Sequence, residues 1–479
     1  MTAGSVLIVT FDGLRRDRVT KELMPNLSRF MAAGTDFINS RSVFPSETRV
    51  AISSLVTGCP PAEHGLVGNA FMHRAVVPDG PFQTARQEHL KLAGEAGLLL
   101  DRPSLGRRLA AAGRQLAVVS TATPGASWMM HSDAAALGQT MFSTNGPGAS
   151  ASPQAALDII DRLGPIPDGG VPDTARIEYA AGVLTEHVYP ALNPDVGIIW
   201  FCDPDKSTHR FGLLSPEAEQ VQRATDSVFG RIVEWWRQGG AGRPENIVVM
   251  SDHGQITGRA DLALAGGHRP DLGGTLVPGY VSSLYLDSPG GEALAVAAAK
   301  LMAEPWCGLV FTKGGNGIDG LVEGTFDLAT VHGDHARAGD LVFTLAATDP
   351  GQDDPLGSCL FSGGIKPGGG MHGGLQRGEL STVLAACGPA FKERTVCEVP
   401  CWLPDIAPTL MRVLGVPAEG MAGRALDEGL ADAGPAAAII DSRRLEASAG
   451  GRRQILDQRA RDGVAITRHG WPGADEYVG

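Results

Sequence analysis

Short runs of apolar, mostly β-branched residues recur along the chain, each bounded by small or polar turn residues. They are SVLIVTFD (5–12), QLAVVST (115–121), DVGIIWFCD (195–203), NIVVMSD (246–252) and STVLAACG (381–388). Stretches with helical spacing separate them, and continuous apolar strands that alternate with helices are typical of a parallel sheet covered on both sides. The sequence therefore predicts an α/β fold, with a mostly parallel central sheet and helices on both faces.

The composition excludes several classes of protein. With 43% hydrophobic and 19% charged residues among 479, the chain has ample material for a buried core. Its net charge of −13 argues against a nucleic-acid-binding surface. No apolar run approaches the roughly 18–20 residues that cross a membrane, and the start, MTAGSVLIVTFDG, lacks the basic region and cleavage site of a signal peptide. We therefore expect a cytoplasmic protein with no membrane contact, whose 7 scattered cysteines are reduced.

Two regions depart from the alternation of strands and helices. The stretch from about 255 to 362 has its own strand-like runs and a helix, which predicts a small inserted α+β cap over the sheet edge. Beyond residue 425 the chain is rich in Ala, Gly and Arg and weakly patterned, as in an oligomerisation arm of a homo-oligomer or a loosely packed extension. The predicted units are a core (1–254 and 363–425), an inserted cap (255–362) and a C-terminal extension (426–479).

Aspartates close or follow three of the predicted strands. Asp12 ends the first run, Asp205 follows the run at 195–203, and Asp252 ends the run at 246–252. Ligands bind at the carboxyl ends of strands in open α/β sheets, so we expect these side chains to meet at one edge. An aspartate at a strand end, taken alone, is more often a helix cap or turn residue.

Three histidines accompany these aspartates. His209 comes four residues after Asp205, so a helical turn places both on one face, and His253 directly follows Asp252. His372 lies in GMHGG, where the glycines allow the backbone to approach a site closely. Together the residues form two nitrogen and oxygen donor sets that suit zinc or a similar divalent ion.

The segment SVFPSETRVAISSLVTG (42–58) contains a candidate nucleophile. Its Pro-Ser-Glu-Thr run is a helix-start signal, and Gly58 is a stop signal. Thr48 is then placed at a helix N-terminus, where free N–H groups and the helix dipole favour a bound phosphate. The alternative is that Thr48 or Ser46 only caps this helix.

Six blocks of sequence resemble the alkaline phosphatase superfamily, and within it the type I phosphodiesterase/nucleotide pyrophosphatase branch, which also includes phosphonoacetate hydrolases. They are FDG (11–13), the nucleophile block with VTG (56–58) and HGLVGN (64–69), PDKSTHRFG (204–212), SDHG (251–254), GMHGG (370–374), and PDIAPTLMRVLGVP with the following GR (404–424). The blocks occur in the order typical of the family. The resemblance implies an alkaline phosphatase-like fold for the core.

The resemblance also implies two divalent metal ions, zinc with manganese or iron as alternatives. It assigns Asp205, His209 and His372 as the ligands of the first zinc. It assigns Asp12, Asp252 and His253 as the ligands of the second zinc. It makes Thr48, ten residues before Gly58, the nucleophile and a contact of the metal. Asn69 matches the residue that holds a non-bridging phosphoryl oxygen.

The function implied is hydrolysis of phosphodiester or nucleotide pyrophosphate-type bonds in a small anionic substrate, through a phospho-threonine intermediate. The sequence departs from the family pattern after Thr48, where Arg49-Val50 replaces Phe-Pro-Asn, which makes Arg49 a candidate substrate contact. Alternatives are a phosphonoacetate or related phosphonate hydrolase, and a phosphomonoesterase, which the lack of a compact basic clamp disfavours. Outside the enzymes, the alternative is a metal-binding pseudoenzyme, which is expected to have lost ligands or nucleophile.

Overall fold

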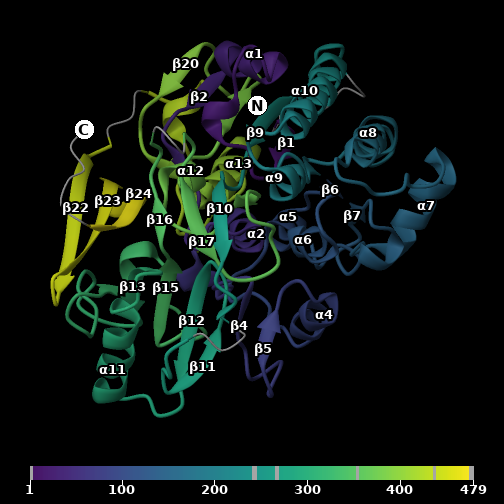
Figure 1. Ribbon diagram of the computed structural model, residues 1–479. Helices are drawn as coiled ribbons and strands as arrows, with labels where there is room; N and C mark the ends of the chain where they lie inside the picture. The colour runs from purple at the N-terminus through teal and green to yellow at the C-terminus, as the bar shows by residue number, and fades with distance from the viewer. Residues whose placement is uncertain (1–3, 240–244, 265–268, 352–354, 435–437, 474–479) are drawn as a thin grey trace.

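An eight-stranded sheet forms the centre of the computed structural model, which describes residues 4–239, 245–264, 269–351, 355–434 and 438–473 (Figure 1). Its strand order is β20-β2-β19-β9-β1-β8-β6-β7. In that order the strands are Thr395–Cys397, Thr35–Phe37, Leu384–Cys387, Asn246–Met250, Val6–Phe11, Val196–Phe201, Leu116–Ser120 and Thr140–Ser143. The strands from β9 to β7 are all parallel, and the predicted α/β class is confirmed.

The strand predicted at 381–388 does not join the parallel set. It forms β19, which runs antiparallel to both β9 and β2. The chain enters β19 from the loop after His372, and this loop lies at the carboxyl edge of the parallel strands. A strand that begins at that edge has to run in the opposite direction.

Strand β1 shows why helices cover both faces of the sheet. Val6 and Ile8 point into one hydrophobic core, whereas Leu7, Val9 and Phe11 point into the other. The first core includes residues of α2 (Thr48–Thr57), α5 (Leu105–Ala111), α6 (Pro124–Met130) and α13 (Ile406–Leu414). The second includes residues of α1 (Pro25–Ala33), α7 (Pro153–Leu163), α8 (Thr174–Gly182) and α10 (Pro216–Arg237).

Two smaller sheets and helix α11 (Gly291–Met302) follow β9 in the chain. The five-stranded sheet has the order β11-β12-β15-β13-β14 and comprises Gly274–Val277, Val281–Leu286, Leu341–Leu345, Cys307–Thr312 and Phe326–Asp327. It lies with α11 at the lower end of Figure 1. The four-stranded sheet has the order β16-β17-β10-β18 and comprises Ala347–Thr348, Ser358–Phe361, Ile256–Asp261 and Gly370–Met371. Because β18 leads directly into His372, this sheet ends at the predicted site.

The weakly patterned region after residue 425 contains three long antiparallel strands, β22 (Ile440–Ala449), β23 (Arg452–Arg461) and β24 (Val464–Gly473), on the left of Figure 1. Their sheet packs on the rest of the chain. The Gln454 side chain accepts a hydrogen bond from the Val310 backbone N–H in β13 over 2.6 Å. Arg461 forms a buried ion pair with Asp405 at 2.8 Å, next to α13. A loosely packed extension therefore does not describe these residues, and an oligomerisation role stays a prediction.

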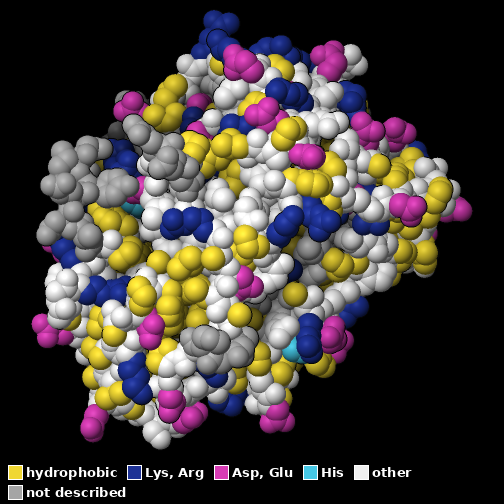
Figure 2. Space-filling model, viewed as in Figure 1, with side chains coloured by type: hydrophobic (Ala, Val, Ile, Leu, Met, Phe, Trp, Pro, Cys, Tyr) yellow, Lys and Arg dark blue, Asp and Glu magenta, His cyan; other side chains and the backbone are white. Residues whose placement is uncertain are grey.

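Charged side chains of both signs are distributed over the surface shown in Figure 2. On the face shown in Figure 2, the described Lys and Arg side chains are interspersed with Asp and Glu and form no continuous basic patch. Within the described ranges, no helix combines the length and apolar character that a membrane crossing requires.

Candidate active site

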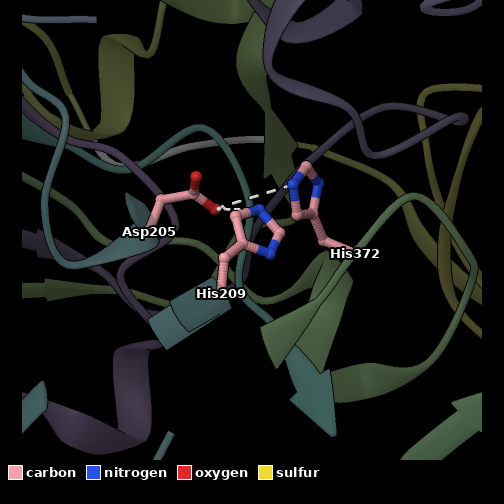
Figure 3. A group of neighbouring side chains, drawn as sticks. All are labelled: Asp205, His209 and His372. Atoms are coloured by element: carbon pink, nitrogen blue, oxygen red, sulfur yellow. Dashed lines mark ion pairs between the residues drawn. The ribbon is translucent and has the colours of Figure 1, made fainter. Parts of the chain in front are cut away.

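The first group of candidate metal ligands lies where β8 gives way to helix α9 (Asp205–Phe211). Asp205 and His209 are one helical turn apart, and Asp205 Oδ1 lies 3.2 Å from His209 Nε2. His372 approaches from the loop after β18, with its Nε2 atom 3.6 Å from the same oxygen. Figure 3 shows the carboxylate and the two rings turned toward one another. One donor atom from each residue lies within 4.8 Å of the others.

The second group lies at the ends of β1 and β9. His253 Nε2 is 3.6 Å from Asp12 Oδ1 and 3.3 Å from Asp252 Oδ2. Asp12, Asp205 and His253 form a second set whose donor atoms lie within 4.8 Å of one another. The structure thus brings all six predicted ligands together, but it places Asp205 between the two groups and connects Asp252 to them through His253.

Each of the three histidines points its Nδ1 atom at a backbone carbonyl oxygen. The pairs are His209 with Gly370 at 2.6 Å, His253 with Gly254 at 2.9 Å, and His372 with Ser46 at 2.9 Å. Since a carbonyl oxygen only accepts, each Nδ1 donates a proton, and in the neutral ring this leaves the lone pair on Nε2. Metal-binding histidines are held in this orientation by such contacts.

The buried carboxylates of the second group lack the partners that they need. Asp12 Oδ2 accepts a hydrogen bond from Trp200 Nε1 at 2.9 Å, and Asp252 Oδ1 accepts one from the Gly13 N–H at 3.1 Å. Asp12 Oδ1 and Asp252 Oδ2, however, are buried without a hydrogen-bond partner.

Burial, followed by the negative charges of Asp252 and Asp205, raises the pKa of Asp12 well above its usual value. Burial also raises the pKa of Asp252. In the absence of a cation, such groups would retain protons. A divalent cation supplies both the missing charge and the missing partner, and the mixed carboxylate and imidazole donors fit zinc.

Thr48 starts helix α2 beside these ligands. Its Oγ1 atom lies 3.1 Å from His253 Nε2. Ser46 is instead fully buried, donates a hydrogen bond from Oγ to the Gly374 oxygen at 2.9 Å, and accepts one from the Gly373 N–H at 3.1 Å. Of the two hydroxyl groups, Thr48 is therefore the one presented to the cluster, and Ser46 supports the loop that carries His372.

A cavity of about 530 Å³ is lined by Thr48 and by four of the six candidate ligands, Asp12, Asp205, His209 and His372. Its lining includes the polar side chains of Arg49, Asn69, Thr123 and Lys206. The segments around β11 and β17 contribute apolar side chains, among them Val277, Tyr280, Val281 and Ile365. The cavity therefore combines candidate metal ligands with cationic and apolar side chains.

The two cations of the cavity wall differ in their partners. Lys206 forms an ion pair with the buried carboxylate of Asp173. Arg49 instead donates from Nη1 to Asn69 Oδ1 and from Nη2 to Thr123 Oγ1, each over 3.1 Å, while its buried Nε has no partner. Burial lowers the pKa of Arg49. The side chain is thus fixed by neutral oxygens and remains available to an anion.

Several supporting residues escaped the sequence analysis. Gln255 donates from Nε2 to Asp205 Oδ1, and Glu47 Oε2 accepts the Asn69 backbone N–H at 2.5 Å. Trp200 and Ser46 support Asp12 and His372 as described above. Gln255 directly follows SDHG, and this adjacency is the one signal that could have suggested its role.

The chain is similar to proteins of known structure and to curated relatives. An inactive variant of murine ectonucleotide pyrophosphatase/phosphodiesterase 5, solved in complex with AMP, matches with a TM-score of 0.63 over 89% of this chain and 100% of that one, at 18% identity. A 64-residue segment is 39% identical to bis(5'-adenosyl)-triphosphatase enpp4 of Xenopus laevis and covers 13% of this chain and 14% of the relative. A 255-residue segment is 23% identical to ectonucleotide pyrophosphatase/phosphodiesterase family member 1 of Rattus norvegicus and covers 53% and 24%.

These matches span about a quarter or less of the curated relatives' own length. The family model for type I phosphodiesterase / nucleotide pyrophosphatase matches residues 6–266, more than half of the chain. That segment includes Thr48, Asn69 and the ligands from β1, α9 and β9. The chain therefore belongs to the type I phosphodiesterase/nucleotide pyrophosphatase family.

Proposed function

We propose that the protein is a metal-dependent phosphoric ester hydrolase that cleaves phosphodiester or nucleotide pyrophosphate-type bonds. One observation carries this proposal: Thr48, at the start of α2, lies 3.1 Å from His253 and lines the same cavity as four further candidate ligands, which are Asp12, Asp205, His209 and His372. Membership of the family supports phosphoryl chemistry at this site.

Two divalent ions, which we take to be zinc, would be held by the six Asp and His side chains of the cluster. When bound, such ions act as Lewis acids that lower the pKa of a hydroxyl group and stabilise charge on a leaving oxygen. The unpartnered oxygens of Asp12 and Asp252 and the three inward-facing Nε2 atoms support this role. With about four positive charges against three carboxylates, the site attracts an anionic substrate.

The reaction that we propose proceeds in two displacements at phosphorus. Thr48 Oγ1 forms a bond to phosphorus as the bond to the leaving oxygen breaks, and the departing group takes up a proton. Water then attacks the phospho-threonine, the bond between phosphorus and Thr48 Oγ1 breaks, and the hydroxyl regains its proton. The N-terminal end of α2 favours the negative charge that Thr48 carries during both steps.

Asn69 is oriented for one role in this reaction. Its Oδ1 atom is occupied by Arg49 Nη1, so its Nδ2 group is the end that remains to donate a hydrogen bond. Glu47 fixes the backbone of Asn69 through its N–H. Asn69 therefore donates from Nδ2 to a non-bridging phosphoryl oxygen of the substrate.

The cavity supports a substrate larger than a phosphate ion. Its volume of about 530 Å³ leaves room for an ester group on each side of phosphorus, and the apolar side chains around Tyr280 offer a packing surface for one of them. This favours a diester over a monoester. We expect kcat/KM for an aryl phosphodiester to exceed that for the matching monoester by at least roughly tenfold, which corresponds to about 1.4 kcal/mol.

Rates of the metal-replete protein on an aryl phosphodiester, an aryl phosphomonoester, a dinucleotide and phosphonoacetate test this proposal. Fastest turnover of the diester or dinucleotide supports it. Fastest turnover of phosphonoacetate assigns phosphonate hydrolysis instead, a second candidate that the available cation of Arg49 favours. A protein that holds its metals and turns over none of the four would be a metal-binding pseudoenzyme.

A further inference from the structure

We propose that Arg49 and Thr123 form a subsite for a second anionic group of the substrate, either a carboxylate or a second phosphoryl group, a few bonds away from the phosphorus that reacts. The inference rests on the proposed function, because it takes the reacting phosphoryl group to lie between Thr48 and Asn69 in the same cavity.

The position of the guanidinium supports a subsite next to the phosphoryl group. Arg49 directly follows Thr48 in α2, and its Nη1 atom is one hydrogen bond, 3.1 Å, from Asn69 Oδ1. Its Nη2 atom reaches across to Thr123, an exposed residue in the turn before α6. Arg49, Asn69 and Thr123 all line the cavity, so a small substrate can contact them together.

Arg49 forms no ion pair within 4.0 Å with a described residue, whereas Lys206, which also lines the cavity, is paired with Asp173. Glu47, Asp12 and Asp205 attract the Arg49 charge only from a greater distance. Glu47, two positions before it in the chain, instead accepts the Asn69 N–H. A partly buried cation without a charged partner is unfavourable, and an anion delivered by the substrate removes that cost.

The hydrogen-bonding capacity of Arg49 points the same way. A guanidinium has five N–H donors, and Arg49 uses two of them, one on Asn69 and one on Thr123. Three remain, including the buried Nε–H that has no partner. Carboxylate and phosphoryl groups each offer paired oxygens that match the fork of a guanidinium. Because neutral oxygens hold the fork in place, little side-chain freedom is lost when the anion binds.

Calorimetric binding to metal-loaded Thr48→Ala protein tests the subsite without turnover. The probes are phosphonoacetate, methylenediphosphonate and the neutral analogue phosphonoacetamide. We expect at least one of the charged probes to bind roughly 10- to 100-fold tighter than the amide, the range of a charged hydrogen-bonded pair. Adding Arg49→Gln should abolish that preference, while Arg49→Lys should keep part of it.

Arg210→Gln is the matched control. Arg210 lies in α9 directly after His209, is exposed and does not line the cavity, so its loss removes one positive charge near the site but outside it. The preference should survive this change. Tight binding of phosphonoacetate alone identifies a carboxylate as the second group, and tight binding of methylenediphosphonate alone identifies a phosphoryl group.

Three results would overturn the proposed subsite. The first is a preference for the charged probes that persists in Arg49→Gln, and the second is no measurable binding of any probe. The third is an equal loss of affinity for all three probes in Arg49→Gln, which would place Arg49 on the reacting phosphoryl group. Failure of the proposed function is a separate result, since it is read from ester turnover by the protein with Thr48 intact.

Discussion

His372 Nδ1 donates a hydrogen bond to the backbone oxygen of Ser46 over 2.9 Å. The Ser46 N–H donates in turn to the backbone oxygen of Gly373 over 2.9 Å, so two hydrogen bonds join the loop after β18 to the loop before α2. One loop carries a candidate metal ligand and the other ends at the candidate nucleophile. The positions of His372 and of Thr48 are therefore linked through the backbone of Ser46.

Replacing Ser46 by Ala should weaken the connection between these two loops without removing the proposed nucleophile, Thr48. The change deletes the buried Oγ that bonds to Gly374 and Gly373, which leaves an N–H and a carbonyl group unpaired. We expect a loss of about 1–3 kcal/mol in the free energy of unfolding and faster loss of metal to a chelator. Urea unfolding and chelator titration measure both. Complete loss of activity with metal and stability retained would make Ser46, not Thr48, the nucleophile.

Thr48→Ala should retain fold and metal but lose on the order of 10³-fold or more in kcat/KM, because the attacking oxygen is gone while the ligands remain. Thr48→Ser restores an oxygen at the same helix start and is the control, with most of the activity expected back. Kinetics combined with elemental analysis decide the matter. Turnover of the alanine variant near that of the unmodified protein would indicate direct attack by water.

Chelation should remove activity and about two divalent ions per chain together. It should also lower the melting temperature, since ions that bind the folded state stabilise it and their removal leaves the buried Asp12 and Asp252 without partners. Elemental analysis, activity and thermal unfolding of the same samples provide the test, with readdition of zinc as the control. Fully active protein that contains at most one ion would contradict the two-metal proposal.

His64 should make stability depend on pH. Its Nδ1 atom accepts from the Leu66 N–H at 3.1 Å, its Nε2 contacts Ser54 Oγ at 2.9 Å, and burial lowers the pKa of this histidine to about 3. An unfolded histidine titrates near about 6.5, so below that pH the unfolded chain binds the extra proton. The contribution is present above about pH 6.5 and is lost as the pH falls toward 3, by up to about 1.4 kcal/mol per pH unit.

Urea unfolding of His64→Gln and the unmodified protein between pH 7 and pH 4.5, both with chelator, isolates this contribution. The variant should be less stable at pH 7 but show a shallower decline with acid. Equal slopes would show that another group dominates.

The sequence predicted those elements whose local pattern and tertiary environment agree. Helical spacing in the sequence predicts helices over 49–57 and 291–302. The structure has α2 over Thr48–Thr57, one residue longer at its start, and α11 over Gly291–Met302. The same spacing predicts a helix over 175–188, and this prediction is wrong in its second half. Helix α8 ends at Gly182, and a π-helix, Val183–Leu192, follows and contains Pro190. Proline lacks an N–H for the α-helical pattern, and composition alone does not show how the chain adapts to that.

Strands β22–β24 were missed for a different reason. Their inward positions include Gln454, Gln458 and Arg461, which are buried and hydrogen-bonded to other parts of the chain, so the alternation of apolar and polar residues is absent. Burial of polar side chains becomes favourable only once their partners are in place. Such partners are set by the tertiary fold and leave no local signal.

In the candidate site, too, the sequence predicts the ligands but not the contacts that orient them. Strand ends and the GMHGG turn marked the six candidate ligands, since the topology of a parallel sheet brings such ends together. The contacts that orient them, such as Gln255 on Asp205 and Trp200 on Asp12, join residues between 50 and 188 positions apart. No spacing rule predicts contacts of this kind.

Strand β24 is translated after the other described strands, and the loop that carries His372 depends on it for support. The Gly470 N–H donates to the Leu375 oxygen over 2.9 Å, and Gln376 Nε2 donates to the Gly470 oxygen over 3.1 Å, so β24 supports the loop that carries His372. Gly470 is translated about 100 residues after His372, an interval of about 5–20 s at typical rates of about 5–20 residues per second. For that time a nascent chain carries all six candidate ligands while the His372 loop lacks its outer support.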